Sequence, residues 1–415
     1  MLTKERKEYF LERLFEFLKI RSISADPKYK PEIIKAVNFL KNELHEIGFS
    51  RIEELYGKSL TFKTNNPVIY AEKLINPKAP TVLIYGHYDV QPPEPIELWD
   101  TPPFEPQVRV GKIFARGATD DKGQLYTHIA ALKLLSAKYG GNFPINIKIL
   151  VEGEEESGGV NIEKLVVEEP DKFKADVCLI SDTGFISKNQ PAIEIGLRGI
   201  VYFEMEVITG KKDLHSGLFG GSVRNPLNEI SKILSQLEKR FANKKLIPIP
   251  ENAKTCSFDV HGIAGGFQGL GAKTVIPNKA SVKFSIRLTP AQSPQKIVKA
   301  VKSFVKERTL KDVEINLKIL GMGEGFLADD SGKYMKLAIE CIRKVFGKKP
   351  ALSRSGGSIP IVSTLSKKTG AEVILMGYGL PDDNLHSPNE KFDLDQFYKG
   401  IECNIEFLRG VENLL

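Results

Sequence analysis

Three clusters of polar side chains follow apolar, strand-like runs in the first half of the chain. They read GHYDVQPP, ARGATDDKGQ and LVEGEEESGG, and together they span Gly86 to Glu156. They offer imidazole and carboxylate groups without a thiolate, a ligand set that is typical of a hydrolytic metal site with open positions. Loops beyond the carboxyl ends of parallel strands share one crevice, so groups that are distant in sequence can meet there. We therefore expect a dinuclear metal centre at these strand ends.

The first cluster contains His87 and Asp89. On an extended segment both side chains lie on one face, because the strand repeats every two residues. A metal-bound histidine usually has its second ring nitrogen held by a carboxylate or a carbonyl, and Asp89 is placed to serve this purpose. A turn histidine beside a capping aspartate is the alternative, which the other clusters make less favourable.

The second and third clusters supply carboxylates. Asp120 and Asp121 precede a helical pattern, where one aspartate suffices as the N-cap and the other can reach the crevice and bridge two ions. Glu154, Glu155 and Glu156 place like charges at a strand end, a repulsion that a cation would relieve. One glutamate can then coordinate metal while a neighbour serves as a base.

Two further residues follow predicted strands at the same end of the sheet. Asp182 comes after the strand at residues 175–180, and His386 lies in the loop after the strand at residues 372–376. Taken singly, each is equally well explained as a polar loop residue. Their positions at the ends of parallel strands make both of them candidate ligands.

The middle of the chain holds candidate substrate-binding residues. Arg287 lies on the polar face of a predicted strand, and its guanidinium fork suits a substrate carboxylate. His215 stands beside glycines that allow a close approach, although an ordinary surface-turn histidine fits the same pattern. Residues 355–358, SGGS, precede a helical pattern and form either an anion site or an ordinary helix start.

The elements that position these residues point to two domains, since 415 residues exceed one typical core. Strands alternate with helices from residue 68 to 182, which predicts an α/β fold with a mainly parallel, helix-covered sheet. From residue 192 the order of strands and helices resembles a ferredoxin-like α+β unit. We therefore predict a catalytic domain at 1–189 and 323–415, interrupted by an inserted domain at 190–322.

Composition excludes several functional classes. The net charge is +7, but the lysines are scattered without a basic block, so we expect no nucleic-acid partner. No apolar run reaches the length of a membrane span, and we expect no membrane association. Four isolated cysteines predict buried thiols and a cytoplasmic protein. These are Cys178, Cys256, Cys341 and Cys403.

The motifs GHYDVQPP, ARGATDDKG, VEGEEESG, SDTG and LHSPNE together resemble one metallopeptidase family along essentially the whole chain. This is the M20-type family, which contains carboxypeptidase G-type enzymes, acetylornithine deacetylases, succinyl-diaminopimelate desuccinylases, aminoacylases and carnosine-type dipeptidases. The stretches KDLHSGLFGG, GLGAKTVIPNKA and GGSIP resemble its dipeptidase branch.

The resemblance implies a role for each candidate residue in the metal centre. One metal ion would be held by His87 and Asp182. The other would be held by Glu155 and His386. Asp120 would bridge both ions through a strained link to Asp121, and Glu154 would be the general base.

The resemblance also implies that the inserted domain is a lid and a homodimerisation module. In the dipeptidase branch such a domain contributes a histidine, here His215, to the active site of the partner subunit. Thr274, Arg287, Gly357 and Ser358 match positions that help to bind substrate there.

The expected reaction is hydrolysis of the peptide bond in dipeptides or short peptides that have a free C-terminal carboxylate. The expected mechanism uses a water that bridges two divalent ions, with Glu154 as general base. Zinc is the first choice of metal, with manganese or cobalt as alternatives. Two other hypotheses stay open, an N-acyl amino-acid deacylase with the same ligands and a noncatalytic metal-binding homologue.

Overall fold

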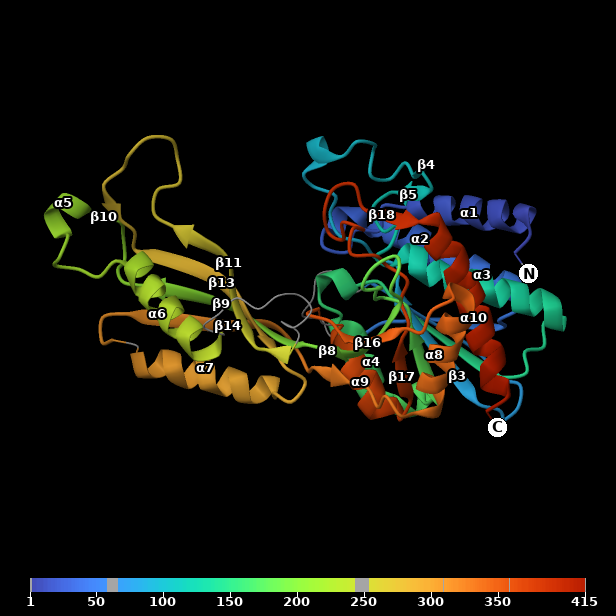
Figure 1. The fold of residues 1–415 in the computed structure, drawn as a ribbon. Coiled ribbons are helices and arrows are strands. Elements are labelled where there is room, and N and C mark those ends of the chain that lie inside the picture. Colours follow the sequence, from blue (N-terminus) through green and yellow to red (C-terminus); the bar gives the residue numbers. More distant parts are fainter. Residues whose placement is uncertain (1, 58–65, 243–253, 309, 358, 415) are drawn as a thin grey trace. The chain divides into compact units, whose positions relative to one another are not determined.

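The computed structural model describes residues 2–57, 66–242, 254–308, 310–357 and 359–414 (Figure 1). The chain forms two compact units. The first comprises residues 1–195, 328–353 and 364–415, and the second comprises residues 196–327 and 354–363. The second unit is thus inserted in the first, and the short segment 354–363 belongs to it as well.

A nine-stranded sheet forms among the described residues, and its central strands are parallel. The neighbours β6, β3, β7 and β17 run in one direction, whereas the outer pairs are antiparallel. The order is β1 (Arg51–Leu55), β2 (Val68–Lys73), β6 (Asn146–Glu152), β3 (Thr81–His87), β7 (Val177–Ile180), β17 (Glu372–Leu375), β8 (Ala192–Leu197) and β15 (Phe326–Leu327), with β16 (Ala351–Arg354) paired to β8.

The central strands bring their carboxyl ends to one edge. His87, at the end of β3, pairs in register with Glu152 at the end of β6. Ile180, at the end of β7, is level with Tyr85 of β3 and with Leu375 of β17. All residues of β6 and β7 are buried, as expected for parallel strands that are covered on both faces. The loops after these four strands therefore start at one level.

Helix α3 (Lys122–Tyr139) is the central helix of the first unit. Its residues from Lys122 to Leu132 are all buried, and it packs on α1, α2, α10 and β3. At its start, a Cβ at Gly123 would lie only 1.8 Å from the carbonyl oxygen of Ala118, so this close turn requires glycine. The other long helices are α1 (Lys4–Leu18), α2 (Lys30–Ile47), α4 (Val160–Glu168), α8 (Lys333–Phe346), α9 (Pro360–Thr369) and α10 (Leu394–Glu412).

A small antiparallel sheet joins two distant parts of the first unit. It consists of β4 (Gln107–Arg109), β5 (Lys112–Phe114) and β18 (Lys391–Asp393), with β5 in the middle. Strand β5 precedes the loop that leads to Asp120, and β18 follows the loop that contains His386. This pairing ties the two loops together at their bases.

The second unit has the strand order of a ferredoxin-like fold. Its elements follow as β9 (Gly199–Ile208), α6 (Pro226–Phe241), β11 (Ser257–Gly265), β13 (Lys279–Leu288), α7 (Pro294–Arg308) and β14 (Glu314–Gly323). The antiparallel sheet runs β14, β9, β13, β11, and the two helices pack on one of its faces (Figure 1). A separate two-stranded ribbon joins β10 (Leu214–His215) to β12 (Val275–Ile276), with α5 (Ser216–Phe219) after β10.

Two sequence-based expectations can be compared directly with the described residues. Among the described residues, no helix is both long and apolar enough to span a bilayer. All four cysteines are unpaired; Cys178, Cys341 and Cys403 are buried as predicted, and Cys256 is only half-buried.

Candidate metal centre

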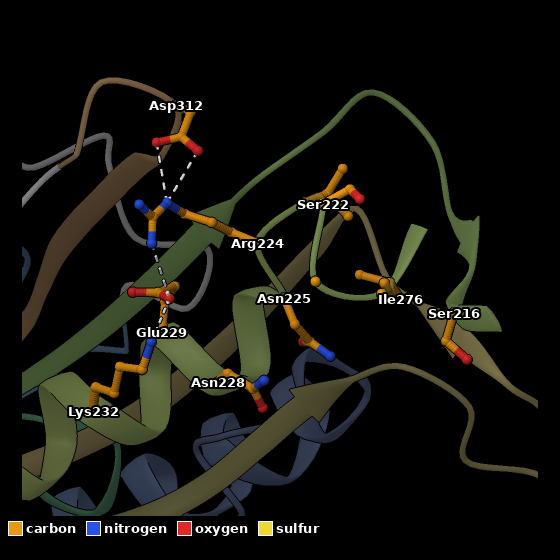
Figure 2. A pocket seen from close by; sticks show the side chains of 12 residues that line it. Ser216, Ser222, Arg224, Asn225, Asn228, Glu229, Lys232, Ile276 and Asp312 are labelled. Atoms are coloured by element: carbon orange, nitrogen blue, oxygen red, sulfur yellow. Dashed lines mark hydrogen bonds and ion pairs between the residues drawn. The ribbon is translucent and has the colours of Figure 1, made fainter. Parts of the chain in front are cut away.

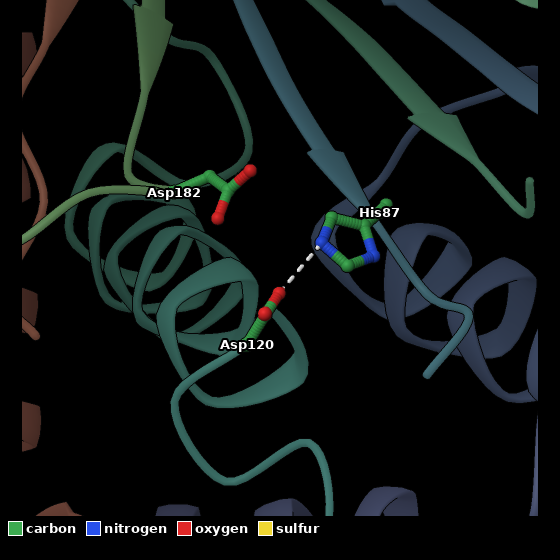
Figure 3. Close-up of side chains that lie close together, drawn as sticks. All are labelled: His87, Asp120 and Asp182. Atoms are coloured by element: carbon green, nitrogen blue, oxygen red, sulfur yellow. Dashed lines mark hydrogen bonds and ion pairs between the residues drawn. The ribbon is translucent and has the colours of Figure 1, made fainter. Parts of the chain in front are cut away.

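His87, Asp120 and Asp182 meet at the carboxyl ends of β3 and β7 and at the start of α3. Figure 3 shows the imidazole of His87 facing the carboxylates of both aspartates. The Nε2 atom of His87 lies 3.0 Å from Oδ1 of Asp120. Each residue offers one ligand atom, and these atoms lie within 4.8 Å of one another. The structure thus brings these three predicted ligands together.

A second group shares Asp120 and adds Glu156 and His386, again with ligand atoms within 4.8 Å of one another. Nε2 of His386 lies 2.9 Å from Oδ2 of Asp120 and 3.3 Å from Oε2 of Glu156. The two oxygens of Asp120 therefore face two different histidines. This is the geometry that a carboxylate needs in order to bridge two ions.

Asp89 connects the first histidine to the glutamate loop. Its carboxylate lies 3.3 Å from Nδ1 of His87 and accepts hydrogen bonds from the backbone N–H groups of Glu155 and Glu156, at 3.2 and 3.1 Å. The Asp89 carbonyl oxygen also lies 3.1 Å from Nδ1 of His87. Asp89 thus orients the His87 ring and fixes the turn that presents the glutamates, which extends the role expected from the sequence.

The three glutamates occupy different environments, and the arrangement differs by one residue from the sequence-based assignment. The carboxylate of Glu154 accepts hydrogen bonds from Asn66 N and from Asn161 Nδ2, outside both ligand groups. Glu156, and not Glu155, is the glutamate that joins Asp120 and His386. Its side chain is 4% exposed and accepts a hydrogen bond from Gln91 Nε2 at 2.7 Å.

The local backbone explains why sequence reasoning missed Glu156. Strand β6 ends at Glu152, and residues Glu155–Ser157 form a 3-10 turn. Strand alternation no longer applies in such a turn, so the direction of each glutamate cannot be counted from the strand. Gln91 was also missed, because its contact with Glu156 joins two loops that no sequence spacing relates.

The electrostatics of this centre call for positive charge. Burial and the carboxylates of Asp121 and Asp120 raise the pKa of Asp182 well above its usual value. Burial also raises the pKa of Glu155, and Glu156 adds to this effect. Hydrogen bonds to Asp120 and Glu156 raise the pKa of His386 to about 10. Imidazole nitrogens and crowded carboxylate oxygens form a donor set that fits two divalent cations.

In the second unit, the predicted residues His215 and Thr274 lie at one two-stranded ribbon, with His215 on β10 and Thr274 directly before β12. His215 pairs with Val275, and the N–H of Ser216 donates to the carbonyl oxygen of Thr274 at 3.1 Å. Both residues are exposed. The Nδ1 atom of His215 accepts from the N–H of Gly217 at 3.1 Å, which leaves Nε2 as the donor in the neutral ring.

Arg287 lies on β13 opposite Ser257 of β11. Burial lowers its pKa, and Asp259 opposes this effect. A second guanidinium, that of Arg198, lies nearby. Burial lowers the pKa of Arg198, and the charge of Arg287 lowers it further. Asp259 thus opposes the effect of burial on the pKa of both guanidiniums.

Arg198 was missed from the sequence, although it stands only one residue before β9. Its N–H and Nε donate to the carbonyl oxygens of Gly357 and Gly356, at 3.0 and 2.8 Å, and Nη1 donates to Ser257 Oγ at 3.3 Å. The predicted Gly357 is thereby attached to the strand region that carries Arg287. The predicted Ser358 lies outside the described residues.

The second unit also contains a hollow of about 570 Å³ (Figure 2). Arg224 lines it and pairs with Asp312 and Glu229, while Lys232 also pairs with Glu229. Its lining cations are thus already paired with carboxylates of the same wall. We therefore assign no ligand to this hollow.

Comparison with known proteins agrees with this fold and these motifs. The profile of peptidase family M20/M25/M40 matches residues 83–410. The Cys-Gly metallodipeptidase dug1 of Schizosaccharomyces pombe is 32% identical over 455 residues, which cover 96% of this chain and 94% of that protein. The Beta-Ala-His dipeptidase of Mus musculus is 30% identical, with 97% and 92% covered.

A solved structure from the same family has a similar fold. An M20 family metallo-carboxypeptidase from Sulfolobus solfataricus superposes with a TM-score of 0.83 at 30% identity, and 98% of this chain and 99% of that chain are covered. The fold and these likenesses define a hydrolytic metalloenzyme. The chain belongs to peptidase family M20/M25/M40. The predicted fold class and the predicted resemblance to the dipeptidase branch are both confirmed.

Proposed function

We propose that this protein is a dipeptidase that requires two divalent metal ions and cleaves the amide bond of dipeptides or short peptides. The observation that carries the proposal is the pair of histidine–carboxylate groups that share Asp120. The relatives support the substrate class, because proteins named Cys-Gly metallodipeptidase and Beta-Ala-His dipeptidase align along nearly the whole chain.

In this proposal, His87 and Asp182 would hold one ion, Glu156 and His386 would hold the other, and Asp120 would contact both. When bound, the ions would lower the pKa of a water and polarise the scissile carbonyl. Zinc remains our first choice, with manganese or cobalt as alternatives, since a site of nitrogen and oxygen ligands accepts all three.

Glu155 replaces Glu154 as the proposed general base. Among the described interactions, no hydrogen bond or ion pair involves the Glu155 carboxylate, whereas that of Glu154 is held by Asn66 and Asn161. A carboxylate in this position can accept a proton from water and then deliver it to the leaving nitrogen. Glu155 would perform both proton transfers.

The second unit would bind the substrate's free C-terminal carboxylate through Arg287, beside the turn at Gly357 that Arg198 holds. A guanidinium fork can donate two parallel hydrogen bonds to a carboxylate. His215 would donate to the developing oxyanion from the partner subunit of a homodimer, a role that its exposed ring allows. A cytoplasmic location remains part of the proposal.

Metal removal and restoration tests the function. The chelated protein should be inactive, and two equivalents of zinc per chain should restore cleavage of dipeptides such as Cys-Gly and β-Ala-His. N-acetyl amino acids should be poorer substrates. Faster turnover of N-acyl amino acids would assign the chain to the deacylases instead, and a fully loaded protein that cleaves none of these amides would be a noncatalytic homologue.

Arg287→Lys tests the proposed carboxylate contact. Lysine keeps the charge but lacks the fork, so kcat/KM for free-acid dipeptides should fall about 10- to 1000-fold. Amidated dipeptides, which lack the carboxylate, should be slow with either protein. An equal loss on both substrate types would assign Arg287 to the folding of the second unit.

A further inference from the structure

Glu390 is a fully buried carboxylate at the junction between two loops that carry metal ligands. It lies four residues after His386, and it is 0% exposed. Its Oε1 accepts hydrogen bonds from the N–H groups of Thr119 and Asp120, at 2.9 and 3.0 Å. The backbone of the shared ligand Asp120 is therefore bonded directly to the segment that contains His386.

The second oxygen of Glu390 completes this arrangement. Oε2 accepts from the N–H of Gly117 and from Nη1 of Arg116, both at 2.8 Å. The carbonyl oxygen of Glu390 accepts from the N–H of Ala115 at 3.1 Å. Glu390 thus contacts five of the six residues from Ala115 to Asp120. It accepts from four backbone N–H groups and pairs with the side chain of Arg116.

Arg116 extends the junction to a third loop. It is 1% exposed, its Nη2 donates to the carbonyl oxygen of Pro92 at 3.3 Å, and its N–H donates to the carbonyl oxygen of Pro103 at 2.8 Å. Pro92 follows His87 and Asp89 in the same loop. The Arg116–Glu390 pair therefore contacts all three loops that carry the two histidines and Asp120.

A buried ion pair of this kind is weak evidence for a role in stability, because desolvation offsets much of the attraction. The hydrogen-bond partners of Glu390 are more informative than its charge, because they are backbone N–H groups of the segment that leads to Asp120. Groups that orient metal ligands commonly change metal affinity about 10- to 100-fold when they are mutated.

We propose that Glu390 is a positioning residue that fixes the backbone of Asp120 relative to His386, so that the two oxygens of Asp120 face the two histidines. This inference rests on the proposed metal centre, but it does not depend on which amide is cleaved. Glu390 itself contacts neither metal ligand side chains nor substrate in this role.

Glu390→Gln tests the proposal on the full-length protein. Glutamine keeps the size of the side chain. Its NH₂ group, however, would face backbone N–H donors where a carboxylate oxygen of Glu390 accepts hydrogen bonds. Zinc affinity, measured by competition with a chelator, should fall about 10- to 100-fold. At saturating zinc, kcat should fall more than KM rises, because the reacting groups are misplaced while substrate contacts remain.

Glu43→Gln is the matched control. Glu43 is also 0% exposed and bonds to Arg13, Tyr126 and Lys133, outside the loops that carry metal ligands. Both variants should lower the melting temperature of the metal-free protein, but Glu43→Gln should leave zinc affinity unchanged. Unchanged affinity in Glu390→Gln, or equal losses of affinity in both variants, would overturn the proposal.

Arg116→Lys keeps the test decisive if Glu390→Gln does not fold. Lysine retains the buried charge but cannot reach both Glu390 and Pro92, so zinc affinity should fall by a smaller factor while the protein still folds. Wild-type affinity in this variant would count against the junction. Wild-type protein that binds zinc but cleaves no peptide would defeat the proposed function and leave this inference standing.

Discussion

At the scale of single residues, the chemistry depends on which of three adjacent glutamates faces which neighbour. Glu154 is anchored by Asn66 and Asn161, Glu155 has its backbone N–H bonded to Asp89, and Glu156 joins Asp120 and His386. The sequence predicts that one glutamate coordinates and another acts as base. It cannot say which, because the 3-10 turn and not the strand period sets their directions.

The glutamates can be separated by substitution with glutamine. Glu155→Gln should keep both metal ions and lose about 10²- to 10⁴-fold in kcat, because the proton acceptor is removed. Glu156→Gln should lose one ion per chain, and Glu154→Gln should keep the metal and most of the activity. Metal content and initial rates on one dipeptide check all three variants.

The opposite pattern would restore the sequence-based assignment. A fully metallated but inactive Glu154→Gln protein, together with an active Glu155→Gln protein, would return the base to Glu154. Loss of metal in Glu155→Gln would likewise return the ligand role to Glu155.

At the scale of elements, the sequence predicts more than it does for the glutamates. Apolar runs before His87, Asp182 and His386 identify the parallel strands, and strand ends are enough to expect the ligands to converge. The contacts that orient the ligands are not predictable in this way. Gln91, Arg198 and Glu390 act through loops whose approach depends on the completed fold.

Helix α3 contains one histidine whose role is structural. His128 is buried, and neither ring nitrogen has a hydrogen-bond partner among the described residues, which indicates a packing role. Burial lowers its pKa to about 3, from an unfolded value near 6.5. The unfolded chain therefore binds more protons between these two values, and stability should fall as the pH drops below about 6.5.

Replacing His128 should remove this acid sensitivity. Between pH 8 and pH 5, the free energy of unfolding of the wild type should fall by about 2 kcal/mol more than that of His128→Leu, from the proton-binding difference alone. Urea unfolding at the two pH values measures this quantity. His45→Gln, on the exposed side of α2, is the control and should behave like the wild type. If His128→Leu had the same pH dependence as the wild type, the account would be contradicted.

At the scale of the whole molecule, our proposal assigns roles to residues of both units and of two subunits. A mixture of His215→Ala chains and Glu155→Gln chains tests this arrangement. In a mixed dimer, one site would receive both intact residues, because the contact is reciprocal in a symmetric dimer. Random mixing should recover about a quarter of wild-type activity, since half of the dimers are mixed and each has one complete site.

The outcome separates two arrangements. Recovery would show that His215 serves the partner's site. No recovery above the two parent variants, with mixed dimers verified by mass, would mean that His215 acts within its own chain or has no part in turnover.

The central claim is that two ions share Asp120, and anomalous diffraction from zinc-loaded crystals tests it most directly. We predict two zinc peaks per chain on either side of Asp120, at about 2.0–2.2 Å from their ligand atoms. One should contact His87 and Asp182, and the other Glu156 and His386. A single peak, or a second ion bound by Glu154 or Glu155 instead of Glu156, would contradict the account.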